Sequence, residues 1–291
     1  MTRFVLWAGA MAVAVLPARA QDDRLAKVEI KATKVAGNVW MLEGAGGNIG
    51  VSAGPDGLLV IDDQFEPLAD KIRAALKGIS PAKLSFLINT HHHGDHTGAN
   101  AVFGKEMTIL AQENVRKRLT EGEKPMAPSG LPVITYADGV SVWFNGEEIR
   151  VFHAPHGHTD GDSIVWFKTS NVVHMGDQFF NGMFPFIDMA SGGSVDGYLA
   201  AVEKVLGQLP ADVKIIPGHG PLATREDLER YLAMLKDTTA AVRKGVAAGK
   251  TADQLKAEKV LAAWDEWSWD FISADKFIDQ LHAGLGATRK P

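Results

Sequence analysis

The first strongly patterned part of the chain, residues 28–63, consists of short apolar runs separated by turn residues. The runs are VEIKATKVA, NVWMLEG, NIGVSA and LLVIDD, and the turn GPDG separates the last two. Short runs bounded by Gly, Pro and Asp are typical of β-strands joined by tight turns. This part is therefore predicted to form consecutive strands.

The pattern then changes from strand to helix and back. After Pro67, apolar residues recur at helical spacing until Gly78 and Pro81 end the pattern. The residues on the apolar face are Leu68, Ile72, Ala75, Leu76 and Ile79. The compact apolar run LSFLINT predicts a buried strand. A short helix, the strand MTILA, the helix QENVRKRL and a loop rich in Pro and Gly are predicted to follow.

The second half of the chain repeats this plan. The runs VSVWF, EIRVFHA, SIVWFKT, NVVHMGD and VKIIPGHG predict strands. Three helices are predicted from Ser194 as an N-cap and from Thr224 and Thr251, each followed three positions later by Asp or Gln. Strands followed by helices, twice and without a linker, predict an α/β fold with helices on the outer faces of two sheets. We expect one domain, residues 21–291, with a helical C-terminal extension from about residue 250.

The N-terminal residues have the pattern of a signal peptide. Arg3 gives a positive start, Phe4–Leu16 is apolar, and Ala18-Arg19-Ala20 resembles a cleavage site. The apolar run is too short to cross a bilayer, and no later run is long enough. We therefore expect residues 1–20 to be removed, which leaves a periplasmic or secreted protein without a membrane segment.

Composition excludes two kinds of chemistry. The chain of 291 residues has a formal net charge of −5 and no stripe of Lys or Arg, which disfavours nucleic acid as a partner. It contains no cysteine, so no thiolate can act as nucleophile or metal ligand. Imidazoles and carboxylates are the candidate ligands that remain.

Four of the ten histidines and an aspartate lie within the stretch INTHHHGDHTGAN, which ends a predicted buried strand. The spacing is H-x-H-x-D-H, formed by His91, His93, Asp95 and His96. Residues two apart in an extended segment point the same way, so His91 and His93 can share one metal ion. Asp95 and His96 are displaced enough to reach a second. Imidazole and carboxylate ligands favour Zn²⁺.

Further candidate ligands follow other predicted strands. They are His158 in HAPHGHTDGD, Asp177 in VVHMGDQ and His219 in IIPGHGP. A glycine lies close to each of them, so the backbone can bend and bring the side chains into a crowded centre. The whole set predicts a metal site at the ends of several strands.

These motifs, in this order, resemble the metallo-β-lactamase superfamily over roughly residues 28–231. The resemblance implies a four-layer αβ/βα sandwich of two mixed β-sheets flanked by helices. It also implies two Zn²⁺ ions per chain in the cleft between the sheets. By this likeness the first zinc is held by His91, His93 and His158, the second by Asp95, His96 and His219, and Asp177 bridges them.

The chemistry expected of such a centre is hydrolysis. Two metal ions about 3.5–4 Å apart share a water and lower its pKa toward neutrality, which gives a bridging hydroxide without a protein base. Asp95 is both a ligand and the candidate that carries the proton to the leaving group. The expected bond is an ester, lactone, thioester or amide, including a β-lactam. A β-lactamase proper, an iron-dependent oxidoreductase similar to sulfur dioxygenases and a non-catalytic metal-binding protein are the alternatives.

The segment QFFNGMFPFIDMASGG after Asp177 predicts the substrate class. The thiolate-using lactamases have Cys in place of Asp177 and a nearby lysine for the substrate carboxylate, whereas this chain has no Lys or Arg between Lys168 and Lys204. We expect a small-molecule substrate with an apolar part. The predicted contacts are Phe180, Met183, Phe184 and Phe186; packing of this segment in the core is the alternative.

Other polar and aromatic residues have predicted supporting roles. Asp62 and Asp63 are expected to brace the site. Thr97, Thr159 and Asn89 are expected either to orient the imidazoles or to make ordinary turn contacts. The remaining histidines and the Trp cluster are expected mainly to be structural: His92, His153, His156, His174, Trp264, Trp267 and Trp269. Substrate contact is the alternative for His92, and a binding wall is the alternative for the Trp cluster.

Overall fold

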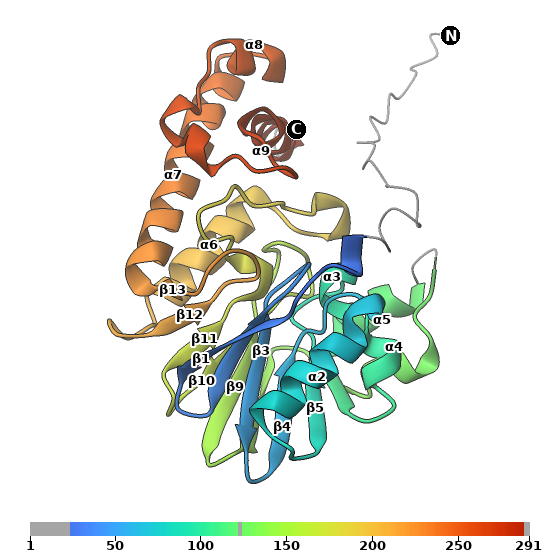
Figure 1. Ribbon diagram of the computed structural model, residues 1–291. Coiled ribbons are helices and arrows are strands. Elements are labelled where there is room, and N and C mark those ends of the chain that lie inside the picture. Colours follow the sequence, from blue (N-terminus) through green and yellow to red (C-terminus); the bar gives the residue numbers. More distant parts are fainter. Residues whose placement is uncertain (1–23, 122–123, 288–291) are drawn as a thin grey trace.

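The computed structural model describes residues 24–121 and 124–287 (Figure 1). The predicted signal peptide lies outside these residues. None of the helices in the described ranges is long and apolar enough to cross a membrane.

The first sheet has seven strands in the described part of the chain, arranged in sequence order. They are β1 (Lys31–Ala36), β2 (Val39–Glu43), β3 (Ile49–Gly54), β4 (Gly57–Ile61), β5 (Leu84–Ile88), β6 (Thr108–Gln112) and β7 (Ile134–Tyr136). The strands β1 to β4 pair antiparallel because tight turns join them, as predicted. From β4 to β7 the pairing is parallel, since helices connect these strands.

The second sheet is also mixed and has the order β13-β12-β11-β10-β9-β8 among the residues described. Its strands are β8 (Gly139–Phe144), β9 (Glu147–His153), β10 (Ser163–Phe167), β11 (Val172–His174), β12 (Lys214–Ile216) and β13 (Ala223–Thr224). Only β11 and β12 pair parallel, because the helix α6 (Val195–Leu206) lies between them in sequence.

Two strands were missed by the sequence patterns. They are β7 and β13, which are three and two residues long, too short for a periodic signal. Both lie at the edge of a sheet.

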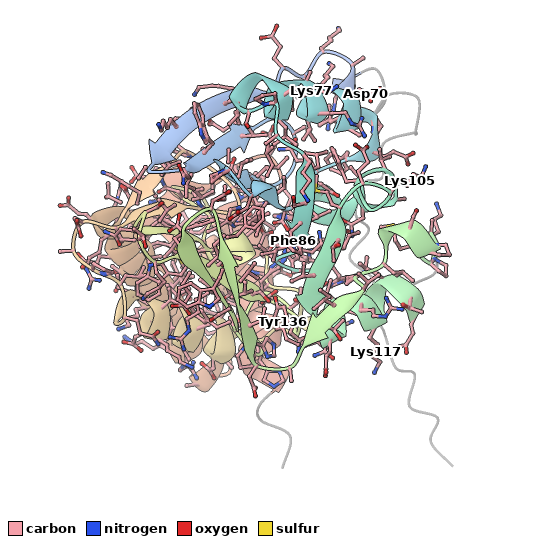
Figure 2. All side chains as sticks on the ribbon, turned by 90° about the horizontal axis from the view of Figure 1, so that it is seen from below. Asp70, Lys77, Phe86, Lys105, Lys117 and Tyr136 are labelled. Carbon is pink, nitrogen blue, oxygen red and sulfur yellow. The ribbon has the colours of Figure 1, made fainter. Side chains whose placement is uncertain are left out.

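Side chains along each strand point alternately to the two faces of its sheet, and this alternation produces the layers of the fold. Leu59 and Ile61 of β4 belong to an apolar cluster with Val165 and Phe167 of β10, which lies between the two sheets. The intervening residues face outward and pack against helices. In Figure 2, Tyr136 of this cluster and Phe86, which packs against it, lie nearer the middle of the molecule than the charged residues Asp70, Lys77, Lys105 and Lys117.

Helices cover the outer face of each sheet, so the four-layer α/β sandwich is confirmed. On the first sheet these are α2 (Ala69–Ile79), α3 (Gly94–Thr97), α4 (Asn100–Phe103) and α5 (Glu113–Glu121). On the second they are α6 and α7 (Arg225–Ala247). The predicted caps are present: Ser194 accepts a hydrogen bond from Gly197 N, and Thr224 and Thr251 form capping boxes.

The C-terminal elements lie at one end of the sandwich, above α6 in Figure 1. They are α8 (Ala252–Ala257), the 3-10 helix η5 (Ala262–Trp267) and α9 (Ala274–Ala287). Phe277 and Leu281 of α9 are buried in the same apolar cluster as α6 and α7. We call residues 262–287 the C-terminal segment.

Candidate metal centre

The structure brings all seven predicted ligands together from loops at the ends of both sheets. His91 and His93 follow β5, Asp95 and His96 lie on α3, and His158 follows β9. Asp177 lies on the 3-10 helix η3 (Gly176–Gln178) after β11, and His219 follows β12. Their ligand atoms form two groups, each close enough to share an ion: His91, His93, His158 and Asp177, and separately Asp95, His96 and His219. A third such group, His92, His93 and Asp188, shares His93 with the first.

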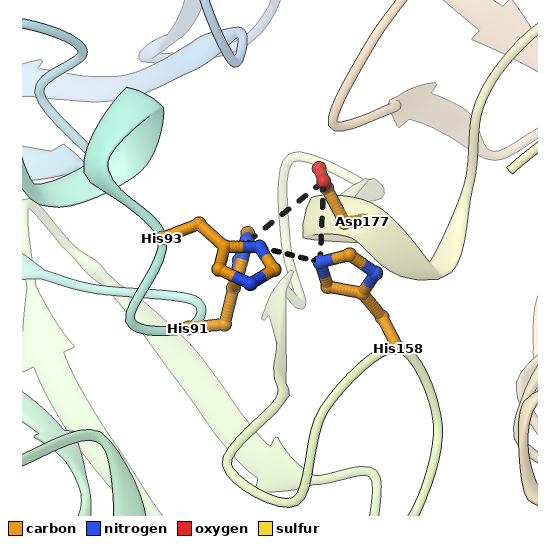
Figure 3. Close-up of side chains that lie close together, drawn as sticks. All are labelled: His91, His93, His158 and Asp177. Carbon is orange, nitrogen blue, oxygen red and sulfur yellow. Dashed lines mark hydrogen bonds and ion pairs between the residues drawn. The ribbon is translucent and has the colours of Figure 1, made fainter. Parts of the chain in front are cut away.

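In the first group, ring nitrogens converge on one point (Figure 3). His93 Nδ1 is 3.2 Å from His91 Nε2 and 2.9 Å from His158 Nε2. Asp177 Oδ2 lies 3.5 Å from His158 Nε2 and 3.8 Å from His91 Nε2.

The other oxygen of Asp177 faces the second group. Asp177 Oδ1 is 3.1 Å from His96 Nε2 and 3.4 Å from His219 Nε2. Asp95 Oδ2 is 3.7 Å from His96 Nε2 and 3.4 Å from His219 Nε2. One carboxylate therefore stands between two sets of ligands, with one oxygen toward each.

Each of these histidines has one ring nitrogen that faces the centre (the inner nitrogen) and one that faces away from it (the outer nitrogen). The hydrogen bond at the outer nitrogen determines whether the inner nitrogen has a free lone pair. His158 Nδ1 donates to the carbonyl oxygen of Phe186 at 2.7 Å, and His93 Nε2 donates to Asp188 Oδ2 at 2.9 Å. Since these acceptors carry no proton, the outer nitrogens carry it. The inner nitrogens of neutral His158 and His93 are then left with free lone pairs.

A short chain of hydrogen bonds fixes His91 in the same way. Thr90 Oγ1 donates to Asp62 Oδ2 at 2.7 Å, so it accepts from His91 Nδ1 at 3.1 Å. The same oxygen, Asp62 Oδ2, also lies 2.7 Å from His96 Nδ1, and Asp62 Oδ1 accepts from the backbone N–H of Thr90. Asp62 therefore orients ligands from both groups, in agreement with its predicted bracing role. Asp63, by contrast, accepts from the backbone N–H of Ala99 and contacts no imidazole.

Burial and charge favour a cation at the centre. Burial lowers the pKa of His158 to about 4 and also lowers the pKa of His91, so both are neutral at pH 7. At Asp177 burial acts to raise the pKa, but the surrounding imidazoles outweigh it and the net pKa is lowered. At His96, burial is outweighed by Asp177, Asp95 and Asp62, which raise its pKa. Negative charge that attracts a proton to His96 would equally attract a metal cation.

The donor set fits divalent metal ions. In the described part of the chain, Asp177 Oδ1 and His96 Nε2 are buried and have no hydrogen-bond partner. Converging imidazole lone pairs would repel one another without a cation between them. Imidazole and carboxylate ligands match Zn²⁺ and similar ions.

Two glycines allow this crowding. A Cβ atom at Gly47 would collide with the ring of His96, and one at Gly218 would collide with Asp177 Oδ1. The backbone at both positions therefore approaches the ligands more closely than any side chain permits.

Several predicted supporting residues make ordinary local contacts instead. Thr97 donates to the carbonyl oxygens of His92 and His93, Thr159 donates to Asp162, and Asn89 exchanges hydrogen bonds with Asn100. None of the three contacts a ligand imidazole. The histidines expected to be structural hydrogen-bond to backbone oxygens: His153, His156 and His174.

A cleft of about 610 Å³ opens at the metal centre. Its lining includes His93, Asp95, Asp177 and His219, and otherwise consists of Arg24, Leu25, Ala45, Gly46, Phe65, Gly94, Phe180, Phe186, Trp269 and Phe271. Of the four predicted substrate contacts, Phe180 and Phe186 line this cleft. Met183 does not, and Phe184 is fully buried against Phe277, so core packing explains Phe184 better than substrate contact.

Sequence patterns missed three residues at this site. Asp188, the partner of His93, is the single acid in an apolar and aromatic segment, which is the signal that could have revealed it. Trp269 was expected to be structural but lines the cleft, together with Phe271. The alternation in WSWDF places Trp269 and Phe271 two positions apart, so that they can face the same side. Trp267 is buried in the core, as expected.

The family follows from comparison with known proteins. A sequence model described as the metallo-beta-lactamase superfamily matches residues 32–219, and the chain belongs to this superfamily. The type 2 metallo-beta-lactamase of Bacteroides fragilis is 25% identical over 171 residues, which cover 58% of this chain and 64% of that protein. A hydroxyacylglutathione hydrolase of Rhodospirillum rubrum is 30% identical over 158 residues, which cover 52% of this chain and 54% of that protein. The match thus spans between about half and two thirds of these relatives.

The fold has close counterparts among solved structures. A metallo-beta-lactamase from Pontibacter korlensis superposes with a TM-score of 0.63 at 17% identity. The superposition covers 72% of this chain and 100% of the other. At this identity the likeness concerns the fold alone.

Proposed function

We propose that the protein is a binuclear zinc hydrolase that cleaves an ester, lactone, thioester or amide bond, β-lactams included, in a small molecule with an apolar part. The position of Asp177 carries the proposal, because its two oxygens face two separate groups of ligands. The names of relatives, a metallo-beta-lactamase and hydroxyacylglutathione hydrolases, support hydrolysis of an amide or a thioester.

When bound, two zinc ions would supply Lewis acidity and lower the pKa of water near the substrate. The protein would hold them through His91, His93 and His158 on one side and Asp95, His96 and His219 on the other. Asp95 is the proton carrier that we propose. Its side chain is 29% exposed and lines the cleft, so it can reach both the reacting atoms and the leaving group.

The walls of the cleft support an apolar substrate. Phe186, Phe271, Trp269 and Phe180 form a continuous row of rings, with centroids 5.7, 5.6 and 6.2 Å apart in turn. The row begins beside His93 and ends where Phe180 stacks on His219 at 4.9 Å. An aryl or alkyl group on these rings would place its neighbouring carbonyl near the centre.

The test combines metal content with turnover. Protein purified without chelator is analysed for metals and assayed with a chromogenic cephalosporin and a p-nitrophenyl ester. We expect about two zinc per chain and hydrolysis of at least one substrate. A single iron with neither activity would contradict the proposal and favour an oxidoreductase on the same fold.

We also propose that the protein is exported, with residues 1–20 as the signal peptide. The support is the sequence pattern of a positive start, an apolar run and a small-residue cleavage site. The mature protein recovered from the periplasm or medium should begin at Gln21. An intact Met1 on the accumulated protein would contradict this.

A further inference from the structure

Residues 184–188 connect the metal centre to the C-terminal segment. This stretch, which we call the orienting loop, belongs to no helix or strand and follows Asp177 in the sequence. The carbonyl oxygen of Phe186 accepts from His158 Nδ1, and the carboxylate of Asp188 accepts from His93 Nε2. The loop therefore orients two of the three imidazoles of the first ligand group.

The loop is attached to α9 by one buried side chain. Gln280 Nε2 donates to the carbonyl oxygen of Pro185 at 3.1 Å, and Gln280 Oε1 accepts from the backbone N–H of Ile187 at 2.9 Å. Gln280 is only 4% exposed, so water cannot readily replace either hydrogen bond.

The contacts alternate along the loop. Positions 185 and 187 bind Gln280, whereas positions 186 and 188 bind the metal-ligand imidazoles. The two sets of contacts thus lie on directly bonded residues. A displacement of the backbone at 185 or 187 therefore moves the acceptors at 186 and 188 directly.

The rest of the C-terminal segment reinforces this attachment. Phe184 N donates to the carbonyl oxygen of Trp267, and Trp269 Nε1 donates to the carbonyl oxygen of Phe184, both at 2.9 Å. The rings of Phe184 and Phe277 stack at 4.8 Å. All these partners lie beyond residue 219, where the match to the superfamily ends.

We propose that the C-terminal segment controls the first metal position, with Gln280 as a positioning residue. It acts by holding the orienting loop, so that Phe186 and Asp188 keep His158 and His93 aimed at the ion. The second group has no hydrogen bond to the orienting loop among the described residues: Asp62 holds His96, and His219 stacks on Phe180. The one ring of the C-terminal segment near this group is Trp269, whose centroid lies 6.1 Å from that of His219 without a hydrogen bond. The effect should therefore be selective for one of the two ions. The inference rests on the metal centre proposed above.

The test is zinc titration of the metal-free full-length protein against a chelating indicator. In Gln280→Met, a side chain of similar length loses both hydrogen bonds. One zinc equivalent should bind about tenfold more weakly or worse, the scale seen when partners of metal ligands are removed. The other equivalent should change little. Unchanged affinity for both equivalents would overturn the proposal.

A matched control separates positioning from general destabilisation. Leu281→Ala truncates a neighbouring buried residue of α9 that makes no side-chain hydrogen bond to the loop. Its thermal unfolding temperature should fall while both zinc affinities stay near those of the wild type. An equal loss of the same equivalent in Leu281→Ala would overturn the role of Gln280.

Two further outcomes keep the test decisive. If Gln280→Met does not fold, Trp269→Phe removes the Nε1 donor to Phe184, together with one ring of an indole that also faces His219. The same equivalent should weaken by a smaller factor; no change, or a loss confined to the other equivalent, would overturn the proposal. If the wild-type protein binds no pair of zinc ions, the proposed function fails instead. The two failures are thus distinguishable.

Discussion

The row of aromatic rings along the cleft gives a prediction in which the loss of substrate binding energy can be calculated from the structure. Phe271 is 41% exposed and lies at the cleft, where it contacts Phe186 and Trp269. A Phe side chain buries roughly 150–250 Å² when fully covered, so roughly 60–100 Å² of Phe271 remains open to substrate. Covering about two thirds of this area would contribute roughly 1–1.7 kcal/mol at about 25 cal/mol per Å².

Phe271→Ala should therefore lower kcat/KM for an apolar substrate by roughly 5- to 20-fold. The assay compares p-nitrophenyl phenylacetate with p-nitrophenyl acetate, whose acyl group is too small to reach the wall. Turnover of the acetate should change little. The ratio of the two kcat/KM values removes any effect of the substitution on metal content, because such an effect acts on both substrates.

The matched control is Trp143→Ala. Trp143 is 76% exposed on β8 and is not among the residues that line the cleft. It should leave the substrate ratio at the wild-type value. If Phe271→Ala also leaves the ratio unchanged, or lowers turnover of both esters equally, the aromatic row does not bind the acyl group and the reasoning is refuted.

Three other variants or conditions test the site. Asp95→Asn should retain some metal but lose most turnover, because a proton carrier is removed; unchanged kcat removes Asp95 from the mechanism. Phe184→Ala should lower the free energy of unfolding by about 3–5 kcal/mol in denaturant titration, and a loss below about 1 kcal/mol would contradict its core position. In metal-free protein, burial lowers the pKa of His158 to about 4, so unfolded chains bind the extra proton between about pH 6.5 and 4. Buried Asp162, whose pKa is raised to about 7, has the opposite effect over the same range, so the slope is compared with that of His158→Gln. The wild type should lose more stability in urea as the pH falls, and equal slopes would contradict the burial of a neutral imidazole.

Most of the fold could be predicted because its signals are local. The strands of the sheets alternate or form compact apolar runs, and Thr224 and Thr251 each carry a capping box within four residues. The strand β7 was not predicted, because three residues are too few to show an alternation of apolar and polar positions and only Tyr136 of the three is buried. Its place at the sheet edge depends on pairing with β6, a contact that no local spacing reveals.

The ligand set was visible for a similar reason. Six consecutive positions contain His91, His93, Asp95 and His96. Each of the other three candidate ligands follows a strand and has a glycine nearby: His158, Asp177 and His219. Residue types that can bind a metal ion thus occur in the sequence at the ends of predicted strands, where a site is expected. The residues that contact substrate were harder to predict, because Phe180, Phe184 and Phe186 are chemically alike. Their different positions depend on Phe277 and Trp269, which are more than 80 residues away.

The supporting shell could not be read from the sequence because its members are ordinary residues joined over long separations. Asp188 contacts His93 across 95 positions, and Gln280 contacts Pro185 across another 95. A glutamine on an amphipathic helix is typical of a solvated face, and only burial shows that both ends of its amide are used. Each candidate ligand of the first group is therefore marked by its own local signal, whereas the orientation of His93 and His158 depends on hydrogen bonds to residues far along the chain. In the proposal made above, a complete superfamily motif is therefore not sufficient by itself, because a segment outside the matched region sets how tightly the first ion is held.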